Sequence, residues 1–216
     1  MPDALTDFVD NDQYDLGVRE LAAHGDVRRY RKGTILINEG DTGETMFIML
    51  SGRVKVFCTD TNHREITFGA FGAGEYFGEM ALDGGTRSAS VITQVPCTCS
   101  VVTRTALLAY IAHRPEFALQ LLSKVIRRLR VATRDARNLA FIDVYGRLSR
   151  FLVELATPQA DGTARVDEPI THQEISSRLG CSREMVSRIL KDLKSGGYIE
   201  INDRRIVLIN KLPQRW

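Results

Sequence analysis

The spacing of apolar residues changes along the chain, and each spacing predicts a different kind of structure. Residues 1–30 read as short polar helical pieces. From Gly33 onward, apolar side chains recur at every second position in short runs separated by glycine-containing turns, which is typical of an antiparallel barrel or sandwich. The predicted buried positions of the first segment are Leu16, Val18, Leu21 and Ala22, and the predicted strands cover residues 34–37, 46–50, 54–57, 66–68, 88–93 and 98–102.

After Pro115 the period becomes that of a helix and stays so to about Ile142. A helix of about 28 residues would be roughly 42 Å long, which exceeds the usual globular length. One face carries an apolar strip formed by Leu119, Leu122, Ile126, Leu129, Thr133, Ala136 and Ala140. We favour a two-fold dimer with parallel copies of this helix paired along the strip. The alternative is a core helix lying on the β-domain.

Two short helices joined by a tight turn are predicted between residues 171 and 195. Thr171 and Glu174 match a capping box, Gly180 ends the first helix, and Ser182 caps the second. The predicted buried positions are Ile175, Leu179, Met185, Val186, Ile189, Leu190 and Leu193. This pattern leaves Arg183, Glu184, Ser187 and Arg188 exposed near the start of the second helix, where a recognition helix contacts base edges.

The chemistry of these side chains suits DNA, because arginine can bind guanine O6 and N7 and glutamate can accept from cytosine N4. Alternating apolar residues from Ile199 to Ile209 add a hairpin, with Arg204 and Arg205 at a tip suited to a phosphate. Ordinary surface helices also carry such charges, so the helix pair alone does not exclude that these helices have no role in binding DNA.

The length of 216 residues suggests one or two domains, and the formal net charge of +2 is unevenly distributed. Residues 170–216 hold nine Lys and Arg against five Asp and Glu, whereas the rest of the chain holds twenty against twenty-two. A basic C-terminal module is expected if that part meets a polyanion. The acidic start has no apolar signal segment, and no run is long and apolar enough for a bilayer, so we expect a cytoplasmic protein without membrane contact.

The stretch from Phe77 to Val91 carries candidate ligand chemistry. Arg87 offers planar donors that match phosphate oxygens, Ser88 adds a hydroxyl, and Glu79 can accept a hydrogen bond from a ribose hydroxyl. A carboxylate and an anion site eight residues apart suit a sugar phosphate. The alternative is a surface ion pair beside an ordinary turn.

Metal and redox chemistry find little support in the sequence. The four cysteines, Cys58, Cys97, Cys99 and Cys181, form no C-x₂-C pair and are expected to be free thiols. The four histidines are scattered, with no H-E-x-x-H motif, so no metal site is predicted. An iron–sulfur sensor is disfavoured because residues 1–57 contain no cysteine.

Several segments resemble one known family. Gly78-Glu79, Ala81 and Arg87-Ser88-Ala89 resemble the phosphate-binding cassette of cyclic-nucleotide-binding domains, and the likeness extends over most of residues 30–103. Residues 138–144 resemble the hinge, and residues 180–190 (GCSREMVSRIL) the recognition helix, of the CRP/FNR family of transcription regulators. The resemblance implies an α+β protein with a jelly-roll-like antiparallel β-roll (1–113), a dimerisation helix and hinge (114–143) and a winged helix-turn-helix (144–216).

The resemblance also implies roles for individual residues. Glu79 would bind the ribose 2′-hydroxyl, and Arg87 with Ser88 the cyclic phosphate, in a nucleotide site that comprises Gly78, Glu79, Met80, Arg87, Ser88, Ala89 and Thr133. Arg183, Glu184 and Arg188 would read a TGTGA-type half-site. The implied DNA-binding set is Thr171, Gln173, Ser182, Arg183, Glu184, Ser187, Arg188, Arg204 and Arg205.

The effector is expected to be cyclic AMP, with one departure from the family pattern. In cyclic-AMP-responsive members two adjacent hydroxyl residues of the long helix face the adenine, and here the matching pair is Ala132-Thr133. Loss of one such hydrogen bond typically costs about 0.5–1.5 kcal/mol. Cyclic GMP and cyclic di-GMP are therefore alternatives, as is a ligand-independent regulator.

The expected function is a homodimeric, ligand-switched transcription regulator. The nucleotide would reorient the hinge near residues 141–143 so that the dimer binds a palindromic site on double-stranded DNA. The resemblance favours activation, with RNA polymerase as a partner. The competing class is a nucleotide-processing enzyme with Glu79 as base, but the sequence offers no paired carboxylate, metal ligand set or activated nucleophile for it.

Overall fold

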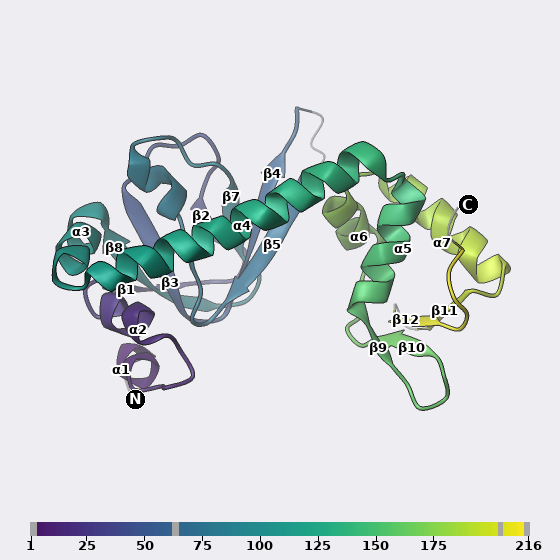
Figure 1. The fold of residues 1–216 in the computed structure, drawn as a ribbon, viewed down its shortest axis with the longest axis horizontal. Helices are drawn as coiled ribbons and strands as arrows, with labels where there is room; N and C mark the ends of the chain where they lie inside the picture. Colours follow the sequence, from purple (N-terminus) through teal and green to yellow (C-terminus); the bar gives the residue numbers. More distant parts are fainter. Residues whose placement is uncertain (1–3, 62–64, 203–204, 214–216) are drawn as a thin grey trace. The chain divides into compact units, whose positions relative to one another are not determined.

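The computed structural model describes residues 4–61, 65–202 and 205–213. The chain forms two compact units (Figure 1). The first holds most of the residues up to Val125, and the second holds the residues from Ile126 onward. The division falls within α4 (Pro115–Phe141), a helix of 27 residues that confirms the long helix expected from the sequence.

The first unit is built on two four-stranded sheets whose paired strands run antiparallel, in the orders β1-β8-β3-β6 and β2-β7-β4-β5. The antiparallel β-domain predicted from the two-residue period is therefore confirmed. The strands are β1 (Asp26–Tyr30), β2 (Ile35–Ile37), β3 (Thr45–Ser51), β4 (Arg53–Thr59), β5 (Glu65–Gly72), β6 (Tyr76–Phe77), β7 (Ser90–Thr93) and β8 (Cys97–Thr103).

Strand β3 is buried on both faces, which explains why residues 46–50 form an unbroken apolar run. Phe47 and Met49 belong to a core cluster that also contains residues of β2, β4, β6, β7 and β8. Met46, Ile48 and Leu50 belong to a second cluster, which they share with α1 (Ala4–Val9), α2 (Leu16–Ala22) and α3 (Arg104–His113). Alternate side chains of one strand thus join the β-core to the helical cover.

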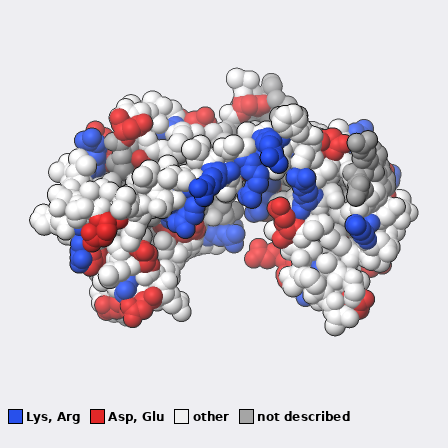
Figure 2. All heavy atoms as spheres, viewed as in Figure 1, with Lys and Arg blue, Asp and Glu red and all other residues white. Residues whose placement is uncertain are grey.

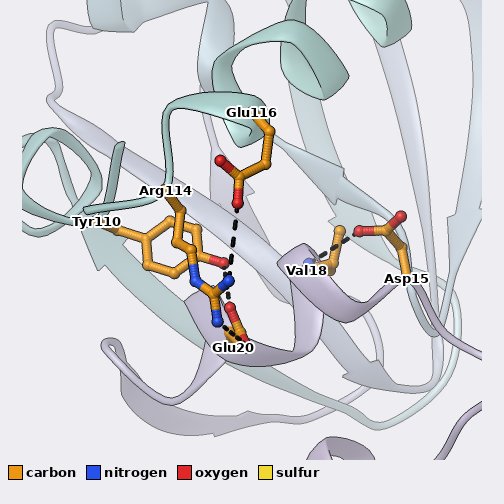
Figure 3. A network of polar contacts seen from close by, with 6 residues as sticks. All are labelled: Asp15, Val18, Glu20, Tyr110, Arg114 and Glu116. Carbon is orange, nitrogen blue, oxygen red and sulfur yellow. Dashed lines mark hydrogen bonds and ion pairs between the residues drawn. The ribbon is translucent and has the colours of Figure 1, made fainter. Parts of the chain in front are cut away.

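A polar network ties α2 to the junction of α3 and α4 (Figure 3). The carboxylate of Glu20 accepts hydrogen bonds from the Tyr110 hydroxyl at 2.8 Å and from Arg114 Nη2 at 2.9 Å. Glu116 lies 3.7 Å from Arg114 Nη1. Burial, and next the bond to Glu20, raise the pKa of Tyr110, so its hydroxyl remains a donor at neutral pH. The start of α4 is therefore anchored to the first unit.

Two sequence-based expectations for this unit are corrected, and one helix was missed. Residues 26–30 are not helical but form β1, an edge strand that pairs with β8 through its backbone although four of its five side chains are exposed. Helix α3 was not predicted, because Leu107 and Tyr110 are its only buried residues. Leu16 is 57% exposed, whereas Val18, Leu21 and Ala22 are buried as expected.

The second unit contains the predicted helix-turn-helix and wing. Its elements are α5 (Val144–Leu155), β9 (Ala156–Pro158), β10 (Ala164–Val166), α6 (His172–Leu179), α7 (Arg183–Ser195), β11 (Ile199–Asn202) and β12 (Arg205–Leu208). The strands form one sheet in the order β11-β12-β10-β9, in which β9 and β10 pair as an antiparallel hairpin. One core cluster joins α5, α6, α7 and the sheet, and Leu148, Ile175 and Leu190 are among its fully buried residues.

Helix α4 leaves much of its apolar strip uncovered in the single chain. Leu119, Leu122, Ile126 and Leu129 are 66%, 53%, 39% and 64% exposed, whereas Phe117 is buried in the core of the first unit. Lys and Arg side chains gather along the same helix (Figure 2), and Arg127, Arg130, Arg134 and Arg137 are exposed. Among the helices of the described residues, none is long and apolar enough to cross a membrane.

Candidate functional site

The segment after β6 forms the first part of the candidate site. Tyr76 and Phe77 are buried, and Gly78 then adopts a φ of 88°, a left-handed conformation that favours glycine. The 3₁₀ helix η1 (Glu79–Asp83) follows, and the chain returns through Gly84 and Gly85 to Arg87 before β7 begins. The turn brings Glu79 and Arg87 into one neighbourhood, and each side chain is only 7% exposed.

The guanidinium of Arg87 is held in a fixed position by neutral acceptors. Its Nη1 donates to the carbonyl of Gly78 at 2.8 Å, and its Nη2 donates to Thr45 Oγ1 at 3.1 Å. Its backbone is also fixed, because the Arg87 N–H donates to the Asp41 carbonyl at 2.8 Å and the Arg87 carbonyl accepts from Gly40 N at 2.9 Å. These bonds orient the guanidinium before any ligand arrives.

Burial makes this cation a receptor for an anion. Burial lowers the pKa of Arg87, and the carboxylates of Asp41 and Glu79 oppose that shift. The guanidinium nevertheless stays protonated, since arginine does not lose its proton in proteins. A phosphate would add charge-assisted bonds to a group that has already lost most of its water.

Two glycines make room for Arg87. A Cβ on Gly43 would lie 2.8 Å from Arg87 Nη2, and a Cβ on Gly78 would lie 2.9 Å from Arg87 Nη1. Gly78 was in the predicted site, whereas sequence reasoning missed Gly43. The only local signal for Gly43 was a glycine in a polar turn, which does not reveal a contact with a residue 44 positions later.

The other predicted cassette residues are more exposed than Arg87. The Ser88 hydroxyl lies 3.4 Å from Met80 Sδ, and Met80 is 60% exposed. Ala89 is half-buried and continues into β7. Cys58, which sequence reasoning did not place here, donates its thiol to the Ser88 carbonyl at 3.5 Å. Burial and the nearby Glu39 raise the pKa of Cys58 to about 11, so this thiol is neutral near pH 7.

Thr133 and this cluster belong to different units. Thr133 is exposed on the part of α4 that belongs to the second unit, and its contact with a nucleotide stays a prediction.

The candidate DNA-binding surface begins with two capped helices. The predicted capping box at α6 is confirmed: Thr171 Oγ1 accepts from Glu174 N at 3.2 Å, and the Glu174 carboxylate accepts from Thr171 N at 2.7 Å. The predicted cap of α7 is also confirmed, since Ser182 Oγ accepts from Met185 N at 3.2 Å. Gly180, at a φ of 62°, lets the chain turn between the two helices.

Helix α7 presents most of the expected side chains. Val186, Ile189, Leu190 and Leu193 are buried and Met185 is half-buried, while Arg183, Glu184 and Arg188 are exposed. Hydrogen bonds from its own backbone N–H and from the Ser182 hydroxyl lower the pKa of Glu184, so it is an ionised acceptor at neutral pH. The expectation that Ser187 is equally exposed is wrong, because it is half-buried and bonded to His172.

The remaining predicted contacts lie on α6 and the wing. Gln173 is exposed, and its Nε2 lies 3.5 Å from Ser177 Oγ. Strands β11 and β12 pair with Asn202 opposite Arg205, which is exposed, and Arg204 lies outside the described residues. Arg205 is the first residue of β12, and its contact with a phosphate stays a prediction.

The cysteines and histidines form no metal centre in the described residues. All four cysteines are free thiols, as expected, and Cys97 and Cys99 are buried in β8. Across residues 4–61, 65–202 and 205–213, no group of three or more His, Cys, Asp or Glu side chains could hold a metal ion.

Comparison with known proteins identifies the two parts separately. Residues 27–114 match the cyclic nucleotide-binding domain, and residues 146–213 match the Crp-like helix-turn-helix domain. The chain is 35% identical to the cAMP-activated global transcriptional regulator Vfr of Pseudomonas aeruginosa, over 88% of this chain and 92% of that protein. It is 32% identical to the cAMP-activated regulator CRP of Salmonella typhimurium, over 91% and 95%.

A solved structure extends the likeness to the fold. The c-di-GMP-responsive global regulator CLP of Xanthomonas campestris superposes with a TM-score of 0.79 at 29% identity, over 91% of this chain and all of that chain. The matched relatives are transcription regulators rather than enzymes, which removes the nucleotide-processing alternative. The chain therefore belongs to the CRP/FNR family, as a cyclic-nucleotide-responsive transcription regulator with a C-terminal helix-turn-helix.

Proposed function

We propose that cyclic AMP binds the cassette of the first unit and switches the affinity of the second unit for DNA. The observation that carries this proposal is the buried, preoriented guanidinium of Arg87 with the buried carboxylate of Glu79 beside it. A cyclic phosphate suits the guanidinium, and a ribose hydroxyl suits the carboxylate. The cAMP-activated relatives Vfr and CRP support this choice of ligand.

Cyclic di-GMP is the second candidate, and two observations favour it. Ala132 replaces a hydroxyl residue that faces the adenine in cyclic-AMP-responsive members of the family. The structural likeness to a c-di-GMP-responsive regulator holds at 29% identity. The titration described below separates the two ligands.

The active species is a homodimer held by α4. Its apolar strip is exposed in the single chain, and Phe141 at the end of the helix is 84% exposed. A second copy of the strip would remove this surface from water, and a two-fold arrangement presents two recognition helices to a palindrome. Arg183, Glu184 and Arg188 read a TGTGA-type half-site, and Arg205 contacts a backbone phosphate. Thr171, Gln173 and Ser182 belong to the same DNA-binding surface, and RNA polymerase is the partner in activation.

The test is a titration of a TGTGA-N₆-TCACA duplex with and without cyclic AMP, cyclic GMP or cyclic di-GMP. Arg87→Ala should abolish the ligand response, because it removes the anion receptor. Arg188→Ala should weaken specific binding by about 1–3 kcal/mol while leaving ligand affinity nearly intact. Arg28→Ala, which removes an exposed arginine of β1, is the matched control and should change neither property.

Two results would overturn this division of roles. Equal loss of ligand binding in the Arg87 and Arg188 variants would show that the sites are not separate. A DNA affinity that no cyclic nucleotide changes would leave a ligand-independent regulator.

A further inference from the structure

A hydrogen bond joins the two helices of the DNA-binding motif at their exposed side. His172, the first residue of α6, has its Nδ1 2.8 Å from the hydroxyl of Ser187 on α7. Both side chains are half-buried. The other ring nitrogen of His172 makes no hydrogen bond to any residue that the structure describes. One side of the imidazole is therefore fixed by Ser187, and the other side is available.

His172 lines a pocket of about 440 Å³ between α6, α7 and the wing. The pocket is bordered by Ile170, Thr171, His172, Gln173, Arg183, Ile201 and Ile206. Ile201 and Ile206 face each other across β11 and β12, and Ile206 is 2% exposed, so part of the wall is apolar. Electrostatic interactions are stronger beside such a wall than in open water. The polar lining consists of donors at His172, Gln173 and Arg183, together with the capping hydroxyl of Thr171.

We propose that this pocket seats one phosphate of the DNA backbone, and that His172 donates to it through Nε2 while Ser187 orients the imidazole. When the Ser187 hydroxyl donates to Nδ1, the neutral ring carries its proton on Nε2, and the protonated ring also has a proton there. In either state the ring can donate from Nε2 to an anion in the pocket. Ser187 is then a positioning residue, and the base-reading role expected for it from the sequence passes to its neighbours.

The placement of the neighbouring side chains supports this assignment. Ser187 lies one turn after Arg183, so both project toward the same side of α7, and Arg183 lines the pocket. Glu184 and Arg188 form the adjacent row and are exposed, which leaves them to contact bases. The Thr171 hydroxyl is already engaged with Glu174 at 2.8 Å, so it is a poorer donor to DNA than the free nitrogen of His172.

The inference rests on the proposed binding of DNA by this unit, and a double-mutant cycle tests it. Dissociation constants are measured for the TGTGA-N₆-TCACA duplex and for a scrambled duplex of equal length and composition, using the full chain with and without cyclic AMP. The variants are His172→Ala, His172→Gln, Ser187→Ala, Ser187→Thr and the double alanine variant. Melting temperatures identify any variant that has lost its fold.

We expect His172→Ala to weaken both duplexes by the same factor, between threefold and tenfold, because a phosphate contact carries no sequence information. Ser187→Ala should cause a smaller loss that disappears in the His172→Ala background. His172→Gln should recover most of the affinity because its amide can still donate, and Ser187→Thr should recover it by keeping the hydroxyl. Arg188→Ala should instead lower the ratio of specific to scrambled affinity.

The outcomes separate this inference from the proposed function. A wild-type chain that binds neither duplex contradicts both. If the wild type binds and His172→Ala does not weaken it, only the phosphate seat is wrong. If Ser187→Ala changes the specific-to-scrambled ratio, or if its effect multiplies with that of His172→Ala, Ser187 contacts DNA independently and the positioning role is wrong.

Discussion

The close packing around Arg87 shows how a ligand site can depend on residues that carry no ligand chemistry. The guanidinium is bonded to a backbone carbonyl and a threonine hydroxyl, and the α-carbons of Gly43 and Gly78 border it. Gly78 has a positive φ, so a side chain there would strain the backbone as well as meet Arg87. No positive φ complicates Gly43, which makes it the cleaner position for a test.

Gly43→Ala should weaken cyclic nucleotide binding without unfolding the first unit. The new Cβ would meet Arg87 Nη2 at 2.8 Å, and the guanidinium must move away from Thr45 Oγ1. Losing one such bond costs about 0.5–1.5 kcal/mol, so calorimetry should show a dissociation constant raised by roughly threefold to tenfold. Gly69→Ala, in β5 with no positive φ and nothing within 4 Å of the added Cβ, is the control for a change in backbone stability. An unchanged affinity in Gly43→Ala would mean that Arg87 does not bind the ligand in this position.

At this scale the sequence predicted the identities of the ligand residues better than their surroundings. Arg87 and Glu79 were found because a guanidinium and a carboxylate in a glycine-rich turn have a recognisable chemistry. Gly43 and Thr45 come from a loop and strand far away in sequence, and Ser187 and His172 are brought together only by the crossing of two helices. Contacts of this kind depend on tertiary structure and leave no local pattern.

Among the elements, α4 followed most directly from the sequence and β1 least directly. The apolar strip repeats over several turns of α4, so its period was visible. Strand β1 is stabilised by backbone pairing with β8 and buries little side-chain surface, so it has no apolar alternation to detect. Helix α3 and the hairpin of β9 and β10 were also missed, because they are short and bury too few side chains to show an apolar period.

Leu129→Asp should dissociate the proposed dimer. Each buried leucine contributes about 1.5–3 kcal/mol, and a two-fold interface would lose two of them, so the dimer dissociation constant should rise by roughly a hundredfold or more. Sedimentation velocity over a concentration series measures this change. Val131→Asp is the matched control, since Val131 is 44% exposed on the same helix but lies off the strip. Dimers of equal stability in both variants would place the interface elsewhere.

On the scale of the whole chain, two separate cores allow the two parts to respond separately. The core clusters of the first unit contain residues from Phe8 to Phe117, and the cluster of the second unit contains residues from Tyr145 to Leu212. The sequence predicted this division from the shift of apolar period and from the basic surplus of the last residues. Multidomain chains of this kind often unfold in more than one step.

Cyclic AMP should therefore raise the melting temperature of the first unit, because it binds to that unit. A ligand at 100 times its dissociation constant stabilises the folded state by about 2.7 kcal/mol, which differential scanning calorimetry detects readily. Arg87→Ala should remove this shift. The TGTGA-N₆-TCACA duplex should raise the melting temperature of the second unit when cyclic AMP is also present. A nucleotide-induced shift that survives in Arg87→Ala would contradict the proposed ligand site.

The joint between α4 and α5 limits how such a response can be transmitted. Helix α4 ends at Phe141 and α5 begins at Val144, so only Ile142 and Asp143 separate them. Asp143 already caps α5 by accepting from Gly146 N at 2.7 Å, and Arg147 Nη1 donates to the Ile142 carbonyl at 2.8 Å. With peptide planes fixed, the linker has four freely variable torsion angles. A change in the angle between α4 and α5 that leaves both helices intact therefore has to come from these four torsion angles.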